Sequence, residues 1–287
     1  MTGHVVLCPN PYRDIELQHT SEAMRMLEAD GIRTVVCPVF NRAKDKNIPQ
    51  EIKTAPLEEN LEGASLVISF GGDGTILHAA RAAMPLEVPI IGVNLGSKGF
   101  MAELEPEELP KILEAARGNF QPDRRMMLSV TLSRRGEIVH RDHALNDAVV
   151  TGIIQVIYIT AFGDGRKITE FSGDGIIVAT PTGSTAYSMA AGGPLVEPSA
   201  LNMILTPICA HVLAARSFVL APEREVTLQV EKLTGKRAVL SVDGGDAVDI
   251  MDGDIVTVKR SKYTTLLAHV AGKSFYDIAY EKLGERK

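Results

Sequence analysis

A glycine turn with one acidic residue is the part of the sequence whose residue types point most directly to chemistry. The pentad Gly71-Gly72-Asp73-Gly74-Thr75 follows an apolar run at residues 66–70, and a helical pattern at 76–84 follows the pentad. Glycines let a polyanion approach the backbone closely, and a helix N-terminus adds favourable partial positive charge. The pentad therefore indicates phosphate binding beside a carboxylate. An ordinary strand-to-helix turn is the alternative, because glycine serves any turn that needs positive φ.

Two further polar groups follow later in the chain. The stretch 180–188 carries hydroxyl side chains at 182, 184, 185 and 188 around an expected helix N-cap, among small residues that would let a ligand lie against the backbone. A capped helix in a seam of small residues is the alternative. The pair Asn146-Asp147 leads into a strand-like run and suits sugar hydroxyls, although a turn at a strand end would look the same.

The elements that must position these residues differ between the two parts of the chain. The first third alternates short apolar strands with helical patterns, which is typical of βαβ units. Parallel strands place their ligand-binding loops at one edge of the sheet, beyond the carboxyl ends of the strands. We expect strands at 4–8, 34–37, 66–70 and 88–93, and helices at 15–29, 76–84 and 107–117.

After Pro122 the pattern changes to strands separated by hairpin signals, as in a sandwich or barrel. We therefore expect an α/β N-terminal domain with a parallel sheet at 1–122, followed by an all-β, sandwich-like domain at 123–270. Apolar residues in the tail have helical spacing, so we expect residues 271–287 to form a helix that packs back on the first domain.

Composition excludes several classes of function. The chain has 287 residues, a net charge of -6 and no basic stripe with interleaved aromatic residues, which argues against nucleic-acid binding. The N-terminus lacks a basic segment followed by an apolar one, and the most apolar run, 202–220, is interrupted by polar residues, so neither secretion nor membrane insertion is expected. Cys8, Cys37 and Cys209 form no C-x-x-C pair, which suits a reducing cytoplasm.

Taken together, the motifs resemble those of the NAD kinase family in type and order, over nearly the whole chain. Phosphofructokinase-like enzymes and diacylglycerol or sphingosine kinases carry a turn similar to the pentad, whereas the block 180–188 is highly specific. The matching segments are the GGDGT pentad, the glycine-rich stretch 92–100, the pair Asn146-Asp147, the triplet Gly173-Asp174-Gly175, the block 180–188, and Gly192-Gly193-Pro194.

This resemblance implies transfer of the terminal phosphoryl group of ATP, or of polyphosphate, to the adenosine ribose 2′-hydroxyl of NAD. Asp73 would be the general base, or would orient that hydroxyl. Mg²⁺ would bridge the donor phosphates with few protein ligands, and the protein would be a homodimer or homotetramer. The implied substrate contacts are Gly71, Gly72, Gly74 and Thr75 for phosphates, Asn146 and Asp147 for ribose, Asp174 near the nicotinamide, and Thr185, Ala186, Tyr187 and Ser188 around the adenosine.

Some positions depart from the family pattern. Asp147 stands where family members commonly have Glu, and Lys98 stands where they often have Leu; Lys98 is either a solvated loop cation or a contact to donor phosphates. The stretch 241–245 resembles the family's late turn at the pocket edge only loosely, so the sequence does not indicate NAD or NADH preference. A lipid kinase with the same turn, or a dinucleotide sensor without catalysis, are the alternative functions.

Overall fold

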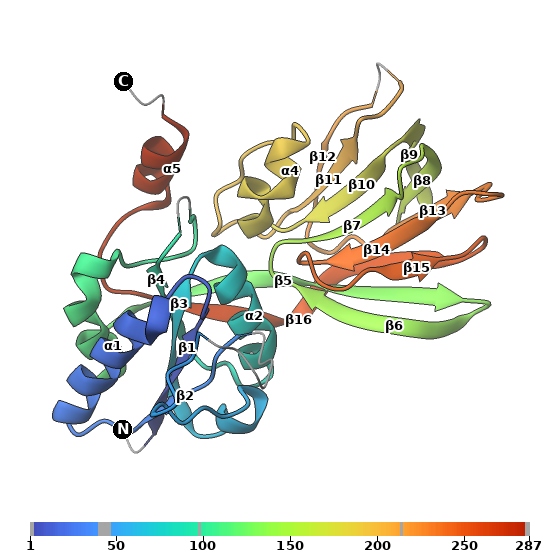
Figure 1. Cartoon of the computed structure of the whole chain (residues 1–287). Coiled ribbons are helices and arrows are strands. Elements are labelled where there is room, and N and C mark those ends of the chain that lie inside the picture. Colours follow the sequence, from blue (N-terminus) through green and yellow to red (C-terminus); the bar gives the residue numbers. More distant parts are fainter. Residues whose placement is uncertain (1–2, 40–46, 97–98, 213–214, 285–287) are drawn as a thin grey trace. The chain divides into compact units, whose positions relative to one another are not determined.

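The computed structural model describes residues 3–39, 47–96, 99–212 and 215–284, so Lys98 lies outside the described residues. Contacts between residues divide the chain into two compact units (Figure 1). The N-terminal unit comprises residues 1–124 with 265–287, and the β unit comprises residues 125–264. The long strands β5 (Gln121–Arg134) and β16 (Ile255–His269) contribute residues to both.

The N-terminal unit contains the expected parallel sheet. Every residue of β1 and β4 is buried, as is typical of parallel strands covered on both faces. The end of β16 continues the sheet, since Leu267 pairs with Ile90 in parallel. The order is β2-β1-β3-β4, made of β1 (His4–Pro9), β2 (Thr34–Val36), β3 (Ala64–Gly71) and β4 (Ile90–Asn94).

The helices of this unit begin and end differently from the pattern-based expectation. Helix α1 (Gln18–Ala29) starts late because Glu16 and Leu17 have positive φ. The segment expected as a helix at 107–117 is a 3₁₀ turn (Pro106–Lys111) followed by the short α3 (Ile112–Ala116), because proline at 110 interrupts the hydrogen-bond pattern. Helix α2 (Asp73–Ala83) begins at the carboxylate of the pentad itself, three residues before the expected Ile76.

A partly buried ionic cluster fixes the end of β16 within the N-terminal unit. His269 contacts Glu103 through Nδ1 at 2.6 Å and Asp123 through Nε2 at 3.0 Å. The other oxygen of Glu103 accepts the backbone N–H groups of Val270 and Ala271. The two carboxylates, Asp123 first, raise the pKa of His269 to about 9, so this imidazole is charged at neutral pH. The expected C-terminal helix follows as α5 (Phe275–Leu283), which has no buried residue.

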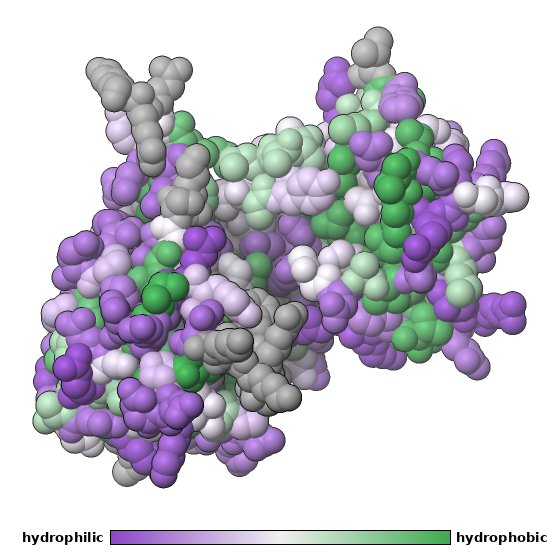
Figure 2. Space-filling view, in the orientation of Figure 1, coloured by the Kyte–Doolittle hydropathy of each residue, from purple (hydrophilic) through white to green (hydrophobic). Residues whose placement is uncertain are grey.

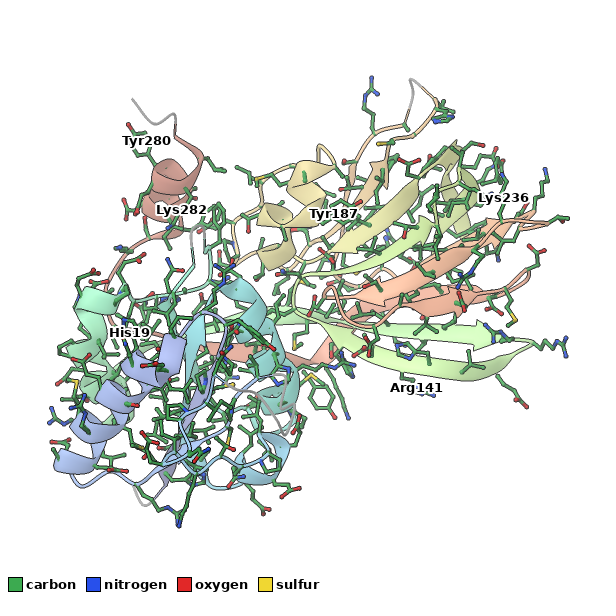
Figure 3. All side chains as sticks on the ribbon, viewed as in Figure 1. His19, Arg141, Tyr187, Lys236, Tyr280 and Lys282 are labelled. Atoms are coloured by element: carbon green, nitrogen blue, oxygen red, sulfur yellow. The ribbon has the colours of Figure 1, made fainter. Side chains whose placement is uncertain are left out.

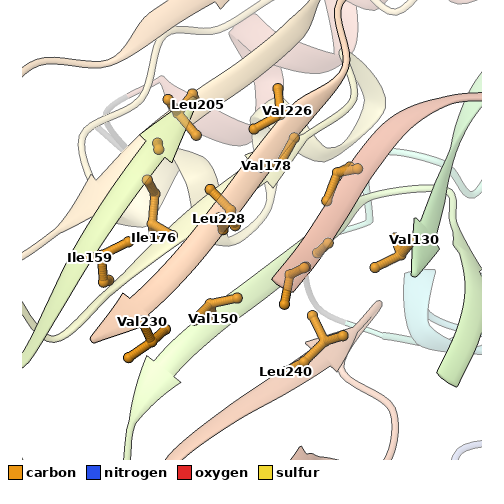
Figure 4. Close-up of a cluster of buried hydrophobic side chains, with 14 of the residues drawn as sticks. Val130, Val150, Ile159, Ile176, Val178, Leu205, Val226, Leu228, Val230 and Leu240 are labelled. Atoms are coloured by element: carbon orange, nitrogen blue, oxygen red, sulfur yellow. The ribbon is translucent and has the colours of Figure 1, made fainter. Parts of the chain in front are cut away.

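The β unit consists of antiparallel layers around a large apolar core (Figure 4), with a smaller apolar cluster beside it. One sheet has the order β12-β11-β10-β7-β14-β15. The other layer joins β13, β8 and β9 to the first part of β16, and β5 pairs with both β16 and β6. The strands are β6 (Glu137–Ala144), β7 (Asp147–Gly152), β8 (Ile157–Gly163), β9 (Arg166–Gly173), β10 (Gly175–Ala179), β11 (Met203–Ile208), β12 (Phe218–Leu220), β13 (Val226–Glu231), β14 (Ala238–Val242) and β15 (Val248–Ile250).

Hydrophilic residues cover most of the visible face of the N-terminal unit, whereas several apolar residues are visible on the β unit (Figure 2). Among the described residues, no helix is both long and apolar enough to cross a membrane.

Candidate active site

The glycine pentad lies at the carboxyl end of β3, where it turns directly into α2. The first N–H groups of a helix have no partner within the helix, and this end carries partial positive charge. A Cβ atom on Gly71 would lie 2.2 Å from Thr75 Oγ1, so only glycine leaves room for that hydroxyl. Thr75 Oγ1 is buried and makes no hydrogen bond. The turn thus presents backbone donors and one unsatisfied hydroxyl beside an acid.

The acid, Asp73, is held by the loop that follows the neighbouring strand β4. Its Oδ2 accepts the N–H of Phe100 at 2.9 Å, and its Oδ1 accepts the N–H of Met101 at 3.1 Å. Gly99 lies so close that a Cβ there would be 3.0 Å from Oδ1. Burial raises the pKa of Asp73, and the backbone hydrogen bonds oppose that rise. The carboxylate is therefore oriented by the backbone and keeps lone pairs for a further donor.

In the β unit, Asn146 and Asp147 form a corner just before and at the start of β7. Three consecutive backbone N–H groups, of Leu145, Asn146 and Asp147, donate to the carboxylate of Asp243 at 2.7, 2.8 and 3.0 Å. Asn146 Oδ1 is buried without a hydrogen-bond partner. Asp147 is 5% exposed, whereas Asn146 is half-buried with its Oδ1 removed from water.

The hydroxyl-rich block packs against the same corner. Thr180 donates its N–H to the carbonyl oxygen of Asn146 at 2.8 Å and its hydroxyl to the carbonyl oxygen of Leu145 at 2.5 Å. Gly183 then comes so near that a Cβ there would lie 2.1 Å from the Asn146 oxygen. Arg125, which is buried, donates to Thr182 Oγ1 at 3.3 Å. One network therefore joins Asn146-Asp147 to the start of the block.

The remaining expected contacts in this unit differ in accessibility. Asp174 and Tyr187 line one hollow of about 500 Å³, together with the loop 151–156. Tyr187 begins the short helix α4 (Tyr187–Ala190) and is 45% exposed (Figure 3). Thr185 and Ala186 are half-buried. Ser188 is fully buried, and its hydroxyl is 2.9 Å from that of Thr206 on β11. In this conformation Ser188 therefore anchors the block to β11.

Comparison with known proteins finds matches over both parts of the chain. The ATP-NAD kinase N-terminal domain matches residues 5–117, and the ATP-NAD kinase C-terminal domain matches residues 145–270. The NAD kinase of Ruminiclostridium cellulolyticum is 34% identical over 97% of this chain and 96% of its own length. That of Carboxydothermus hydrogenoformans is 40% identical over 82% and 84%. The chain belongs to the NAD kinase family.

Solved structures of NAD kinase relatives share the fold. The crystal structure of yeast NADH kinase complexed with NADH has a TM-score of 0.84 and 25% identity, and covers 99% of this chain and 89% of its own. The crystal structure of an NAD kinase from Archaeoglobus fulgidus in complex with ATP has a TM-score of 0.76 and 25% identity, with 99% and 100% covered.

Sequence reasoning gave no individual role to three residues whose contacts join the NAD kinase motifs. Asp243 lies in the stretch 241–245, Thr180 opens the block 180–188 ahead of the hydroxyl positions considered, and Arg125 had no expected role. Of the three residues, only Asp243 carried a sequence signal, because an Asp-Gly pair is typical of a tight turn. In the structure both Asp243 and Gly244 have positive φ. The partners of all three residues lie 35 to 98 positions away in sequence.

Two acidic residues of this NAD kinase fold lie close enough to oppose each other's charge. Burial, and then the charge of Asp243, raises the pKa of Asp147 to about 7. When the pKa of a carboxyl is higher in the folded than in the unfolded protein, the free energy of unfolding falls as the pH rises from the unfolded to the folded pKa. For Asp147 this range runs from about 4 to about 7.

Replacing Asp147 by asparagine should therefore stabilise the protein without substrates. At pH 8 we expect a gain of about 1–3 kcal/mol in the free energy of unfolding, which shrinks as the pH falls towards 4. Urea unfolding at several pH values measures it. Asp164→Asn is the control, since hydrogen bonds lower the pKa of that exposed acid. A destabilised Asp147→Asn protein at pH 8 would contradict the expected charge repulsion.

Proposed function

We propose that this chain transfers the terminal phosphoryl group of ATP to the adenosine ribose 2′-hydroxyl of NAD, giving NADP. One observation carries the proposal. Among the described residues, the buried side-chain polar atoms without a hydrogen-bond partner are Thr75 Oγ1 and Asn146 Oδ1. Buried polar groups are normally satisfied, so each marks a place where a ligand would complete the hydrogen bonding. One lies in the expected phosphate motif and the other in the expected ribose motif.

Asp73 would serve as the general base or would orient the acceptor hydroxyl. An alcohol is a poor nucleophile at neutral pH, and a carboxylate that accepts its proton while aligning it with the γ-phosphorus lowers the barrier. The two backbone N–H groups on Asp73 keep the carboxylate fixed while leaving acceptor capacity. Only the ionised carboxylate accepts a proton, so turnover should fall when the pH drops below the pKa of Asp73.

The donor would bind as a magnesium–ATP complex. The N–H groups at the start of α2 and the hydroxyl of Thr75 suit phosphate oxygens, and Gly71, Gly72 and Gly74 let those oxygens approach the backbone. Hydroxyl and carboxylate oxygens are also ligands that Mg²⁺ accepts, so the turn fits a cation carried on the phosphates. When bound, Mg²⁺ neutralises charge that develops on the phosphoryl oxygens.

NAD would be held by residues of the β unit. The Asn146 amide would donate hydrogen bonds to ribose hydroxyls or accept them, and the Asp147 carboxylate would accept them. Asp174 and Tyr187 line the same hollow, which supports their proposed roles near the nicotinamide and the adenosine. Thr185 and Ala186 would complete the adenosine contacts. Ser188 would shape the adenosine pocket through its hydrogen bond to Thr206, or would contact the adenosine itself after a local change of conformation.

Thr75→Val should separate substrate binding from stability. Valine has nearly the same shape and lacks the unsatisfied hydroxyl, so stability without substrates should be unchanged or slightly higher. The kcat/KM for ATP should fall by about tenfold or more, as expected for a lost hydrogen bond to a charged group. Thr20→Val is the matched control, because the buried Thr20 hydroxyl donates to Asp14. That control should lose stability and keep its KM for ATP; unchanged ATP kinetics in Thr75→Val would contradict the phosphate role.

One assay distinguishes the proposed function from a lipid kinase and from a sensor without catalysis. Purified protein is incubated with labelled Mg²⁺-ATP, NAD or NADH, and diacylglycerol, and NADP is detected with an NADP-specific dehydrogenase. We expect NADP from NAD. Label in diacylglycerol without NADP would indicate a lipid kinase, and dinucleotide binding without turnover would indicate a sensor.

The homodimer or homotetramer expected from the family resemblance remains a prediction. The β unit exposes large apolar side chains, among them Ile154, Val212 and Val219, which supports self-association. Size-exclusion chromatography with light scattering measures the mass directly.

A further inference from the structure

The strongest feature outside the residues already assigned is the turn after β14. Asp243, at φ 49°, and Gly244, at φ 68°, form a tight turn that returns the chain towards β15. The neighbouring strands fix this turn beside the Asn146-Asp147 corner, because Val242 pairs with Ala148 in antiparallel register. Asp243 also donates its own N–H to the carbonyl oxygen of Asp147 at 3.0 Å.

The carboxylate of Asp243 uses both oxygens on this corner. Oδ2 accepts from Leu145, and Oδ1 accepts from both Asn146 and Asp147. Three successive N–H groups that converge on one anion fix the backbone direction of that segment, and with it the directions in which the next side chains leave it. A neutral side chain with one acceptor oxygen cannot receive all three.

We propose that Asp243 is a positioning residue for NAD: it fixes the backbone from Leu145 to Asp147 so that the side chains of Asn146 and Asp147 meet the dinucleotide correctly. This inference rests on the proposed function. Asp243 touches no reacting atom and acts through the corner that it holds. Its effect should therefore be specific to NAD and absent from ATP, whose expected motif lies in the other unit.

The charge of Asp243 gives a second consequence. Acidic groups facing it are Asp147 at the start of β7 and Asp142 on β6, and both carry the same sign. Removing the charge of Asp243 should let Asp147 ionise at lower pH. If kcat/KM for NAD changes with pH because Asp147 ionises, that change should then occur at lower pH. A loss of stability alone would not produce such a shift.

Asp243→Asn tests the proposal, because asparagine tolerates positive φ and has nearly the same size. Its amide group must face at least one of the three N–H donors. We expect kcat/KM for NAD to fall at least about tenfold, since truncating one charged hydrogen-bond acceptor has that scale. The KM for ATP should stay within about twofold, and the pH profile for NAD should shift down.

Asp164→Asn is the matched control. Asp164 has the same φ of 49° in another Asp-Gly turn, and its carboxylate accepts the N–H of Glu225 and pairs with Arg224. This control should keep wild-type kinetics for both substrates.

Unchanged kcat/KM for NAD in folded Asp243→Asn protein, or equal losses for NAD and ATP, would overturn the positioning role. Should Asp243→Asn fail to fold, Asp243→Glu keeps the charge on a longer side chain, and a folded Glu variant with normal NAD kinetics would overturn the role equally. Failure of the proposed function is distinguishable, because the wild type itself would then form no NADP. In that case NAD binding to wild type and Asp243→Asn is compared by calorimetry, and equal affinities overturn the role.

Discussion

Asp73→Asn should lower kcat for NADP formation at least about a hundredfold, the scale of a lost general base. Asparagine has nearly the same size but accepts a proton far less readily than a carboxylate. NAD and ATP should still bind, with KM values within a few-fold of wild type, because the phosphate and ribose contacts are provided by other residues. Initial rates over a range of both substrates measure kcat and KM separately.

The variant also disturbs the loop that Asp73 holds, since one of its oxygens becomes an amide that faces Phe100 or Met101. Asp14→Asn controls for this effect. Asp14 is fully buried in the same unit, and its two oxygens accept backbone N–H groups of His19 and Thr20. That control should lose stability and keep its kcat per folded molecule. Near-normal kcat in Asp73→Asn would show that Asp73 only anchors the loop.

Gly183→Ala should reduce kcat/KM for NAD by about a hundredfold, the scale of a misplacement of about 1 Å at a substrate-holding group. The new methyl group would lie 2.1 Å from the carbonyl oxygen and 2.7 Å from the Cα of Asn146. Both are backbone atoms, so no side-chain rotation relieves the clash, and the Asn146-Asp147 corner must move.

Gly163→Ala is the matched control for this glycine. It lies in the same unit, and its Cβ would meet only the end of the flexible Ile168 side chain, at 3.0 Å. We expect nearly wild-type kinetics there. Thermal melting of both variants reports folding, and a folded Gly183→Ala protein with unchanged kcat/KM for NAD would contradict the proposed role of the corner.

The fold was predictable wherever local pattern and burial agree. The fully buried β1 and β4, and the glycine turns of the β hairpins, follow from apolar runs and turn residues. The exact start of α1 did not follow, because positive φ at Glu16 and Leu17 has no sequence signal. The regular helix expected at 107–117 was wrong in its first half, where Pro110 interrupts it, although proline is itself a sequence signal against a helix interior.

The candidate site was predictable as separate motifs, and its supporting contacts were not. Gly71 to Thr75 and Asn146-Asp147 stand out by residue type alone. The roles of Asp243 and of the Glu103-His269-Asp123 cluster depend on partners about 100 or more positions away, which only the folded chain brings together. The burial of Ser188 against Thr206 likewise depends on how the block packs on β11.

Transfer to the 2′-hydroxyl of NAD is tested most directly by phosphorus-31 NMR of the product formed by purified protein from NAD and Mg²⁺-ATP. We expect one new phosphomonoester signal, coupled to the proton on C2′ of the adenosine ribose, that grows at the same rate as ADP. ADP formation without a phosphomonoester on the dinucleotide, or a phosphomonoester on another carbon, would contradict the proposed reaction.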